Sequence, residues 1–186
     1  ARIRAISISN TSDRCVFFAT ASEDGSIKIW NFERRKLIDI LHSQIPLKRL
    51  RISPNEQYIA AGSSDGMIKI WKLQNRKCLC TIPKAHSEEI RSIVFTNDSQ
   101  FFLTGSCDKS IKIWRFGGKI SLSYTFMNAH DDEIDMICLA NHDHNLLSVG
   151  ADMKIKIWDL ERKICLHTIE NSHSSFITSI AVSSDN

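Results

Sequence analysis

Serine, histidine and aspartate, the side chains that many hydrolases use for nucleophilic catalysis, recur together in this chain. The clearest set is His86, Ser106 and Asp108. In a hydrolase the histidine would take the proton of the serine hydroxyl, and the aspartate would orient the histidine. A catalytic nucleophile occurs once, however, whereas comparable groups return along this sequence, each time ahead of a tryptophan. The repetition favours a structural role, and we predict no catalytic residue and no enzymatic activity.

A motif of nine residues returns four times, and every tryptophan of the chain lies in it. Its copies read SEDGSIKIW, SSDGMIKIW, SCDKSIKIW and GADMKIKIW, and they end at Trp30, Trp71, Trp114 and Trp158. The steps between successive tryptophans are 41, 43 and 44 residues, and an aspartate lies six residues before each tryptophan. A period of this size is typical of an array of supersecondary units, so the repeat decides the expected fold.

Each repeat predicts four short strands separated by turns. In the first repeat apolar residues alternate before residue 10, an apolar run covers 15–21, and Asp24-Gly25 supplies tight-turn chemistry before the strands 26–32 and 37–41. The corresponding strands are expected over 47–52, 58–61, 67–73 and 78–82, over 90–95, 101–105, 110–116 and 120–126, and over 134–139, 146–149, 154–160 and 164–169. Residues 176–182 match the first strand of a fifth set. The sequence therefore predicts an all-β protein of antiparallel sheets.

Four-stranded sheets of this kind must stack face to face, because one sheet cannot bury both of its faces. Pairs of isoleucines before each tryptophan, such as Ile111 and Ile113, supply the apolar faces. The lysine between them recurs as Lys28, Lys69, Lys112 and Lys156. We expect its stem to lie between sheets while its charged head reaches water, and we prefer this to an anion site.

With these features the chain resembles the WD-repeat β-propeller family over essentially its whole length. The resemblance rests on the recurring Asp-x-x-Ile-Lys-Ile-Trp, on a serine two residues before the aspartate, and on a histidine 28 residues before the tryptophan, as at His86 and His130. The dipeptide Trp158-Asp159 is the one that names the family. The resemblance implies a segment of four four-stranded antiparallel blades and the first strand of a fifth.

The expected blades cover about 1–42, 43–84, 85–128 and 129–171, with the start of a fifth at 172–186. Closed propellers of this family usually have seven blades, which would need close to 300 residues at about 42 residues each. We therefore expect the chain to be part of a larger, seven-blade type of propeller, or of a complex that completes it.

The resemblance also implies a buried hydrogen-bond network in each blade. The aspartate accepts bonds from turn amides and from the histidine, the histidine bonds to the serine hydroxyl, and the serine accepts the indole N–H. This set is complete in the third blade as His86, Ser106, Asp108 and Trp114. The other positions are Ser22, Asp24 and Trp30, then Ser63, Asp65 and Trp71, then His130, Asp152 and Trp158. The second blade has Ser43 in place of histidine, and the fourth has Gly150 in place of serine, where we expect water to take that role.

Partner binding is expected on the narrow rim around the channel entrance. By the resemblance, the rim positions are Arg4, Glu23, Lys48, Ser64, Glu89, Arg91, Cys107, Glu133, Asp135 and Phe176. Their charge runs from basic in the first two blades to acidic in the fourth, which would orient a charged partner. Unselected, solvated charge explains the same pattern equally well.

The family resemblance implies a non-catalytic scaffold that presents this rim to other proteins in a multi-subunit assembly. One alternative is an RNA- or anionic-lipid-binding propeller that uses Arg2, Arg4, Lys48 and Arg91. Another is a regulatory propeller attached to a catalytic domain outside this segment. An enzyme or metal site at the channel mouth would have to use Glu89, Glu133 and Asp135.

Composition narrows these classes. The net charge of +3 is small and evenly spread, so we do not expect nucleic acid as the partner. No apolar run approaches the roughly 20 residues of a membrane span. The six cysteines form no CxxC pair, so we expect reduced thiols in an intracellular, cytoplasmic protein with no metal and no cofactor. The one histidine cluster, His142-Asp143-His144, is expected to be a solvated turn.

Overall fold

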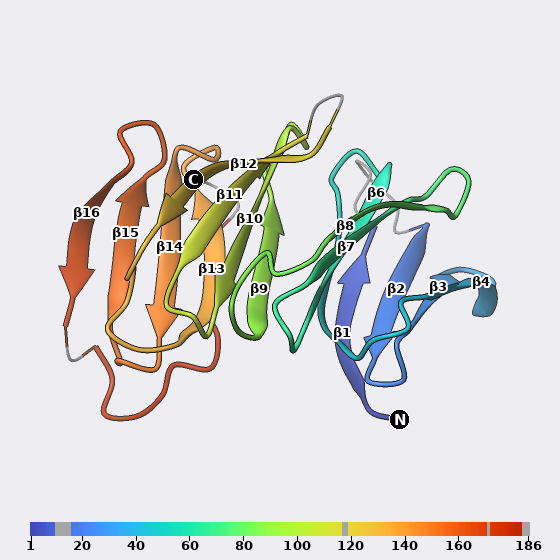
Figure 1. Cartoon of the computed structure of the whole chain (residues 1–186), viewed down its shortest axis with the longest axis horizontal. Helices are drawn as coiled ribbons and strands as arrows, with labels where there is room; N and C mark the ends of the chain where they lie inside the picture. The colour runs from blue at the N-terminus through green and yellow to red at the C-terminus, as the bar shows by residue number, and fades with distance from the viewer. Residues whose placement is uncertain (10–15, 117–118, 171, 184–186) are drawn as a thin grey trace.

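The computed structural model describes residues 1–9, 16–116, 119–170 and 172–183, and its regular elements there are sixteen β-strands (Figure 1). Cys15, the first residue of an expected strand in the first repeat, lies outside the described residues. Residues 184–186, the last of the expected fifth blade, also lie outside them. The strands form four sheets of four antiparallel strands, each in chain order. The predicted all-β architecture of four four-stranded blades is therefore confirmed.

The sheets follow one another along the chain. The first contains β1 (Ile3–Ile8), β2 (Phe17–Ser22), β3 (Ser26–Asn31) and β4 (Lys36–His42). The second contains β5 (Leu47–Ile52), β6 (Tyr58–Ser63), β7 (Ile68–Lys72) and β8 (Cys78–Ile82). The third contains β9 (Ile90–Phe95), β10 (Phe101–Ser106), β11 (Ile111–Arg115) and β12 (Ser121–Phe126). The fourth contains β13 (Ile134–Ala140), β14 (Asn145–Gly150), β15 (Ile155–Asp159) and β16 (Ile164–Ile169).

Tight turns join the second and third strands of every sheet. Gly25 and Gly66 adopt the left-handed conformation there, with φ of 78° and 77°. A β-carbon at Gly66 would lie 2.2 Å from the carbonyl oxygen of His86, so this turn also needs glycine for space. In the third and fourth sheets Lys109 and Met153 take the corresponding left-handed position. Each repeated aspartate therefore lies inside its turn, directly before the left-handed residue.

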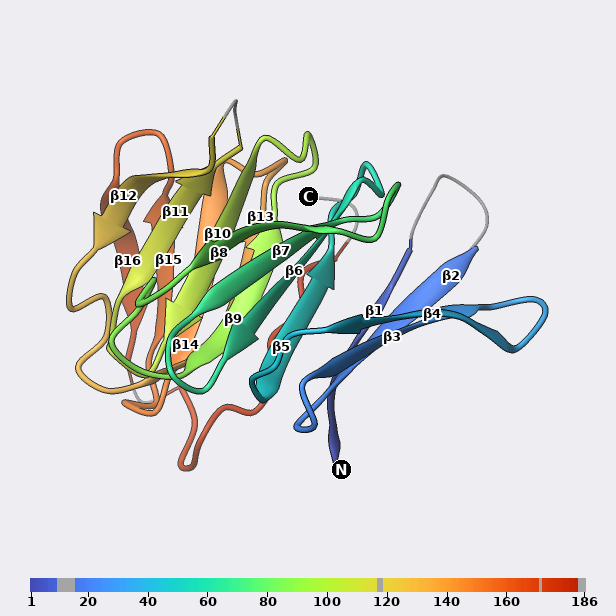
Figure 2. The ribbon, with the colours of Figure 1, turned by 45° about the vertical axis from the view of Figure 1, so that its right-hand side comes forward.

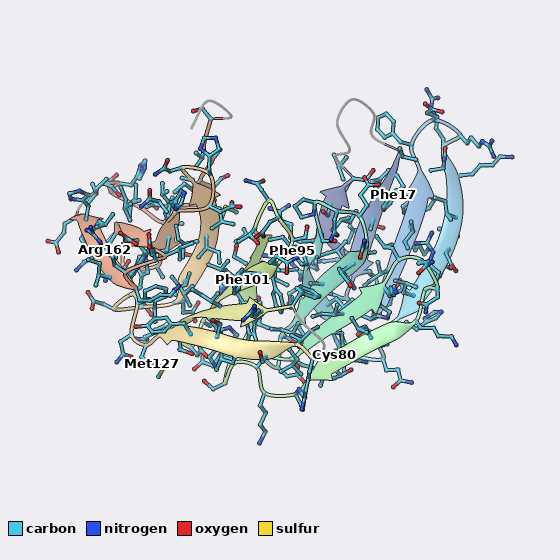
Figure 3. All side chains as sticks on the ribbon, turned by 90° about the horizontal axis from the view of Figure 1, so that it is seen from above. Phe17, Cys80, Phe95, Phe101, Met127 and Arg162 are labelled. Atoms are coloured by element: carbon cyan, nitrogen blue, oxygen red, sulfur yellow. The ribbon has the colours of Figure 1, made fainter. Side chains whose placement is uncertain are left out.

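The four sheets stand side by side in an open arc, seen from above in Figure 3. Their first strands neighbour one another along its concave side, and Figure 2 shows β5 between β1 and β9. The facing surfaces of adjacent sheets are closed by apolar side chains, among them the fully buried Ile27, Ile29, Ile68 and Ile111. The pairing of third with fourth strand shifts just before the tryptophan in every sheet, as between Ile113 and Trp114. Such bulges sharpen the local twist that a propeller blade needs.

The segment after the fourth sheet lies where a fifth blade would begin. Phe176 and Thr178 line the same cavity as Asp135 of β13, and Ile177 is buried. No strand is assigned to the described residues of this segment, 172–183. An edge segment gains strand pairing only from a neighbouring strand, and the described residues provide none here.

Three of the four recurring lysines, all of them half-buried, bond through their charged heads to backbone carbonyls. Lys69 donates to the carbonyl oxygen of Ser43, Lys112 to that of Ala85, and Lys156 to that of Ala129 at 2.6 Å. These carbonyls belong to the segments that enter the second, third and fourth sheets. Each lysine therefore ties its sheet to its own incoming segment, because a buried stem places the ammonium group within reach of unpaired backbone oxygens.

Candidate functional site

The third sheet contains a complete hydrogen-bond network that ends at its tryptophan. His86 Nδ1 lies 2.9 Å from Asp108 Oδ2, and the hydroxyl of Ser110 donates to Asp108 Oδ1 at 2.6 Å. On its other side His86 Nε2 lies 2.7 Å from the hydroxyl of Thr104, which accepts the indole N–H of Trp114 at 2.9 Å. The network therefore joins the incoming segment, the tight turn and two strands of one sheet.

The hydroxyl in this network is Thr104, and the prediction of Ser106 in that role is wrong. Ser106 instead accepts the backbone N–H of Asp108 at 3.1 Å and donates to the carbonyl of Glu88 at 3.3 Å. Ser106 ends β10 at the turn, whereas Thr104 lies two residues deeper in the strand, where the indole can reach it. A hydroxyl ten residues before the tryptophan was the sequence signal that we missed: Thr20, Thr104 and Ser148 occupy this position, and Ala61 breaks the series.

The fourth sheet repeats the network, and Ser148 takes the role for which we expected water in place of a serine. His130 Nδ1 lies 2.9 Å from Asp152, His130 Nε2 lies 2.7 Å from Ser148 Oγ, and Trp158 donates to the same hydroxyl at 2.8 Å. A β-carbon at Gly150 would lie 2.8 Å from the carbonyl oxygen of Glu133 and 2.9 Å from His130 Nδ1. A side chain at position 150 would therefore require the surrounding backbone of this sheet to shift, whereas the third sheet holds Ser106 at the corresponding position beside the same network.

The first two sheets have partial networks. In the first, Trp30 donates to Thr20 at 3.2 Å, and Asp24 accepts the Ser26 hydroxyl at 2.6 Å; Ser22 accepts the N–H of Asp24 at 3.4 Å. In the second, Asp65 accepts from the hydroxyl of Ser63 and from the N–H of Met67. Ser43, at the histidine position, donates to the carbonyl of Ile45, and Ala61 offers no hydroxyl to Trp71.

The network resembles a catalytic triad in its distances but cannot act as one. Burial lowers the pKa of His86 in spite of its bond to Asp108. Burial alone would raise the pKa of Asp108, but its bonds with His86 and Ser110 hold it well below the ordinary value. A neutral His86 therefore donates from Nδ1 to an ionised Asp108 and accepts the Thr104 O–H at Nε2. Thr104 is 0% exposed and already accepts the Trp114 N–H, so no substrate can reach its hydroxyl.

The predicted rim residues come together as a row of ion pairs along the concave side of the arc. Glu23 pairs with Arg4, whose Nε lies 2.7 Å from it, and with Lys48 at 3.7 Å. Lys48 also lies 3.8 Å from Glu89 in the third sheet. The row therefore passes from the first sheet through the second to the third.

Arg91 continues the row into the fourth sheet. It contacts Asp135 at 2.7 Å and Glu133 at 2.8 Å, and Glu89 at 4.0 Å. Positive and negative groups thus alternate across all four blades, so the gradient from basic to acidic that residue types suggested is largely neutralised by pairing. The side chains in this row, which we call the rim row, are 21–40% exposed.

Three predicted rim residues lie outside the ion pairs. Ser64 is exposed, and Phe176 is 68% exposed beside a cavity of about 450 Å³ that Arg91 and Asp135 also line. Cys107 is only 6% exposed, and its sulfur accepts a bond from Arg91 Nε at 3.0 Å. Burial raises the pKa of the Cys107 thiol to about 11, so it stays protonated near neutral pH.

Acidic and thiol groups meet at the rim, but they do not make a metal centre. Donor atoms of Glu88, Cys107 and Glu133 lie within 4.8 Å of one another. The guanidinium of Arg91 bonds to both Cys107 and Glu133, so a cation already occupies this position. Metal binding would also need the thiolate, which the raised pKa opposes. In the His142-Asp143-His144 turn, Asp143 accepts from the backbone N–H and the side chain of Asn97 instead.

Comparison with known proteins agrees with the architecture. The family model described as "WD domain, G-beta repeat" matches residues 1–31, 37–72, 76–115 and 121–159. No curated protein matches the chain. Proteins of the matched family are generally non-catalytic and typically bind other proteins. Among the described residues no helix has the length and apolar character needed to span a bilayer. Each match after the first begins at the fourth strand of one sheet and continues through the first three strands of the next. Four successive matches in this register show that the chain belongs to the WD-repeat family.

Proposed function

We propose that this chain is a non-catalytic scaffold whose rim row binds other proteins within a multi-subunit assembly. The observation that supports this most directly is the rim row itself, which links charged side chains of all four blades while leaving them partly exposed. The networks beneath it repeat from blade to blade, whereas the rim positions vary in size, charge and exposure. Variation above a repeated framework is the arrangement expected of a recognition surface.

The pairing of the rim charges favours binding in a second way. Arg91 is held by Cys107, Glu133 and Asp135, so its long side chain has lost much of its rotamer freedom before a partner arrives. Association then costs less conformational entropy at this position. The alternating charges give a partner one favourable register along the rim, which promotes specificity more than affinity.

The same contacts disfavour the competing functions. Arg4, Lys48 and Arg91 all have carboxylate partners, so the rim is a poor match for the phosphates of RNA or anionic lipids. Glu89, Glu133 and Asp135 all lie within 4.0 Å of Arg91, which keeps them from acting as free bases or metal ligands. A regulatory propeller that serves a catalytic domain elsewhere remains compatible with the proposal, because it would use the same rim.

A charge-reversal experiment tests the rim. The variant K48E/R91E/D135K and the wild-type chain serve as baits in quantitative affinity capture, and the control is R34E, an exposed residue of the first sheet far from the rim. Both variants lower the net charge by two, so a general charge effect would appear in both. We expect the triple variant to lose a defined set of partners that R34E retains. Identical partner lists for all three baits would reject the rim as the binding surface.

We also propose an intracellular, cytoplasmic location. The five cysteines within the described residues are all free thiols, which suits a reducing compartment. Imaging of the tagged protein in cells tests this directly. Extracellular or lumenal signal, together with protection of the thiols as disulfides, would overturn it.

A further inference from the structure

A groove opens between the third and fourth sheets, at the end of the blades opposite the rim row. Its floor is apolar and consists of Phe101 and Leu103 of β10, Ile113 of β11, and Leu160, which follows β15. Phe101 is labelled in Figure 3, which looks onto this end of the molecule. The cavity measures about 390 Å³, within the range of small-ligand sites. The groove therefore has room for one more side chain, which would have to come from outside the fourth sheet.

The neighbouring junction, between the second and third sheets, shows what fits at this position. Phe116 stands two residues after its tryptophan, as Leu160 does, and its ring stacks on Tyr58 with a centroid distance of 4.8 Å. Tyr58 in turn corresponds to Phe101, thirteen residues before the tryptophan. Phe116 is 9% exposed and packs in one apolar cluster with Ala60 and Ile70, the counterparts of Leu103 and Ile113. The chain thus fills one junction with an aromatic ring of its own, whereas the next junction has the smaller Leu160 at the equivalent position and a cavity beside it.

The mouth of the groove adds a charge preference. Glu161 is exposed and has no ion pair or side-chain hydrogen bond within the described part of the chain. Lys163 is already engaged, because it donates to the carbonyl of Leu160 and lies 5.7 Å from the ring centre of Tyr124. Asp143 is held by Asn97. Two carboxylates, Asp143 and Glu161, and one ammonium, Lys163, line the mouth, so its net charge is negative, and Glu161 is the carboxylate whose side chain makes no bond among the described residues.

We infer that this groove binds a segment of another protein in which an aromatic residue lies next to lysine or arginine. The ring takes the place between Phe101 and Leu160 that Phe116 fills one junction earlier, and the cation pairs with Glu161. Burying a ring removes a large apolar area from water and supplies most of the affinity. The groove is at the opposite end of the blades from the rim row and shares no residue with it. Failure of one interface in an experiment would therefore leave the other untouched.

The junction between the first and second sheets is a natural control. It has a cavity of about 450 Å³ and a leucine, Leu73, at the position of Leu160. Its lining is mostly polar, however, with Glu56, Lys72 and Arg76 among the residues. A ring entering there would strip water from these groups, so we expect no aromatic selectivity at this junction.

Methyl NMR of the chain tests the inference with defined probes. N-acetyl-Lys-Phe-amide is titrated against chain with labelled isoleucine and leucine methyls, alongside the Lys-Ala and Glu-Phe analogues. We expect saturable shifts of Leu103, Ile113 and Leu160 with Lys-Phe, at least about tenfold weaker binding of Lys-Ala, and about threefold weaker binding of Glu-Phe. No saturable shift at these methyls, or equal binding of the alanine probe, would overturn the inference.

Two variants locate the binding. L160F copies the filled junction, so we expect it to weaken the Lys-Phe probe at least about tenfold without lowering the melting temperature, while L73F binds like the wild type. E161K lies on an exposed turn and should remove the preference for Lys-Phe over Glu-Phe with the fold intact. Unchanged binding by L160F would refute the site. Self-association that L160F abolishes in sedimentation experiments would also refute it, because the occupant would then be a second copy.

Discussion

Trp114 donates its indole N–H to the hydroxyl of Thr104, ten residues earlier on the adjacent strand, across 2.9 Å. Through His86 this hydroxyl connects the largest side chain of the blade to the aspartate of the tight turn. The relationship recurs between Trp158 and Ser148 and, without a histidine, between Trp30 and Thr20. It makes the buried hydroxyl, and not the serine of the turn, the central member of the network.

Removal of the Thr104 hydroxyl should therefore cost more stability than removal of the Ser106 hydroxyl. Thr104→Ala leaves both His86 Nε2 and the Trp114 N–H unpaired in a buried site, and we expect a loss of about 2–4 kcal/mol, against about 1 kcal/mol for Ser106→Ala. Urea unfolding measures both, and Thr104→Ser, which keeps the hydroxyl, serves as the control. An equal or larger loss for Ser106→Ala would contradict the assignment.

Truncation of Trp114 should be among the most damaging single changes in the chain. The ring is buried and stacks near Phe102, with centroids 6.0 Å apart. Trp114→Ala should lower the free energy of unfolding by about 3–5 kcal/mol, because it leaves a large cavity and removes one of the two hydrogen bonds of the Thr104 hydroxyl. Calorimetry compares this loss with that of Trp30→Ala. The Trp30 ring is less buried, so its truncation should lower the free energy of unfolding by less. An unchanged melting temperature would refute the role given to Trp114.

Stability should fall on acidification, beginning near the ordinary pKa of histidine. The pKa values of His86 and His130 are lowered, chiefly by burial, from an ordinary value of 6.5. The unfolded chain therefore binds protons first, and stability is lost as the pH falls below about 6.5. The carboxyls of Asp108 and Asp152 also have lowered pKa values, so their contribution is present above 3.8 and is lost at more acidic pH.

Urea unfolding at pH 7.5, 6.5 and 5.5 measures this dependence. His86→Gln should reduce the slope between pH 7.5 and 5.5, while His142→Gln, at an exposed turn, should leave it unchanged. A stability that does not vary over this interval would show that the two buried histidines bind protons equally in the folded and unfolded chain.

The cysteines should differ strongly in reactivity. Cys78 and Cys165 are exposed, whereas Cys107 is buried, bonded to Arg91, and has a thiol pKa raised to about 11. The thiolate is the reactive form, so alkylation at pH 8 should label Cys78 and Cys165 well before Cys107. Mass spectrometry of the time course measures the order. Early labelling of Cys107 would mean that the contact with Arg91 is not maintained in solution.

The sequence by itself determined the repeat, the strands and the turns of this protein. These features depend on local chemistry and on a fixed period: isoleucines alternate before each tryptophan, and an aspartate precedes the left-handed residue of each tight turn. The pairing of His86 with Asp108 and of His130 with Asp152 was implied by the family resemblance, and the structure has both pairs.

Only the tertiary structure decided which groups meet across neighbouring sheets and which meet in the interior of a sheet. Thr104 and Ser106 point to one side of the same strand and offer the same hydroxyl, so only their distance from the indole distinguishes them. The ion pairs of Arg91 with Glu133 and Asp135 join residues 42 and 44 positions apart, which no local pattern specifies. The sequence shows a leucine at 160 where 116 is phenylalanine, but only the packing of the neighbouring sheets determines that a cavity remains beside the smaller side chain.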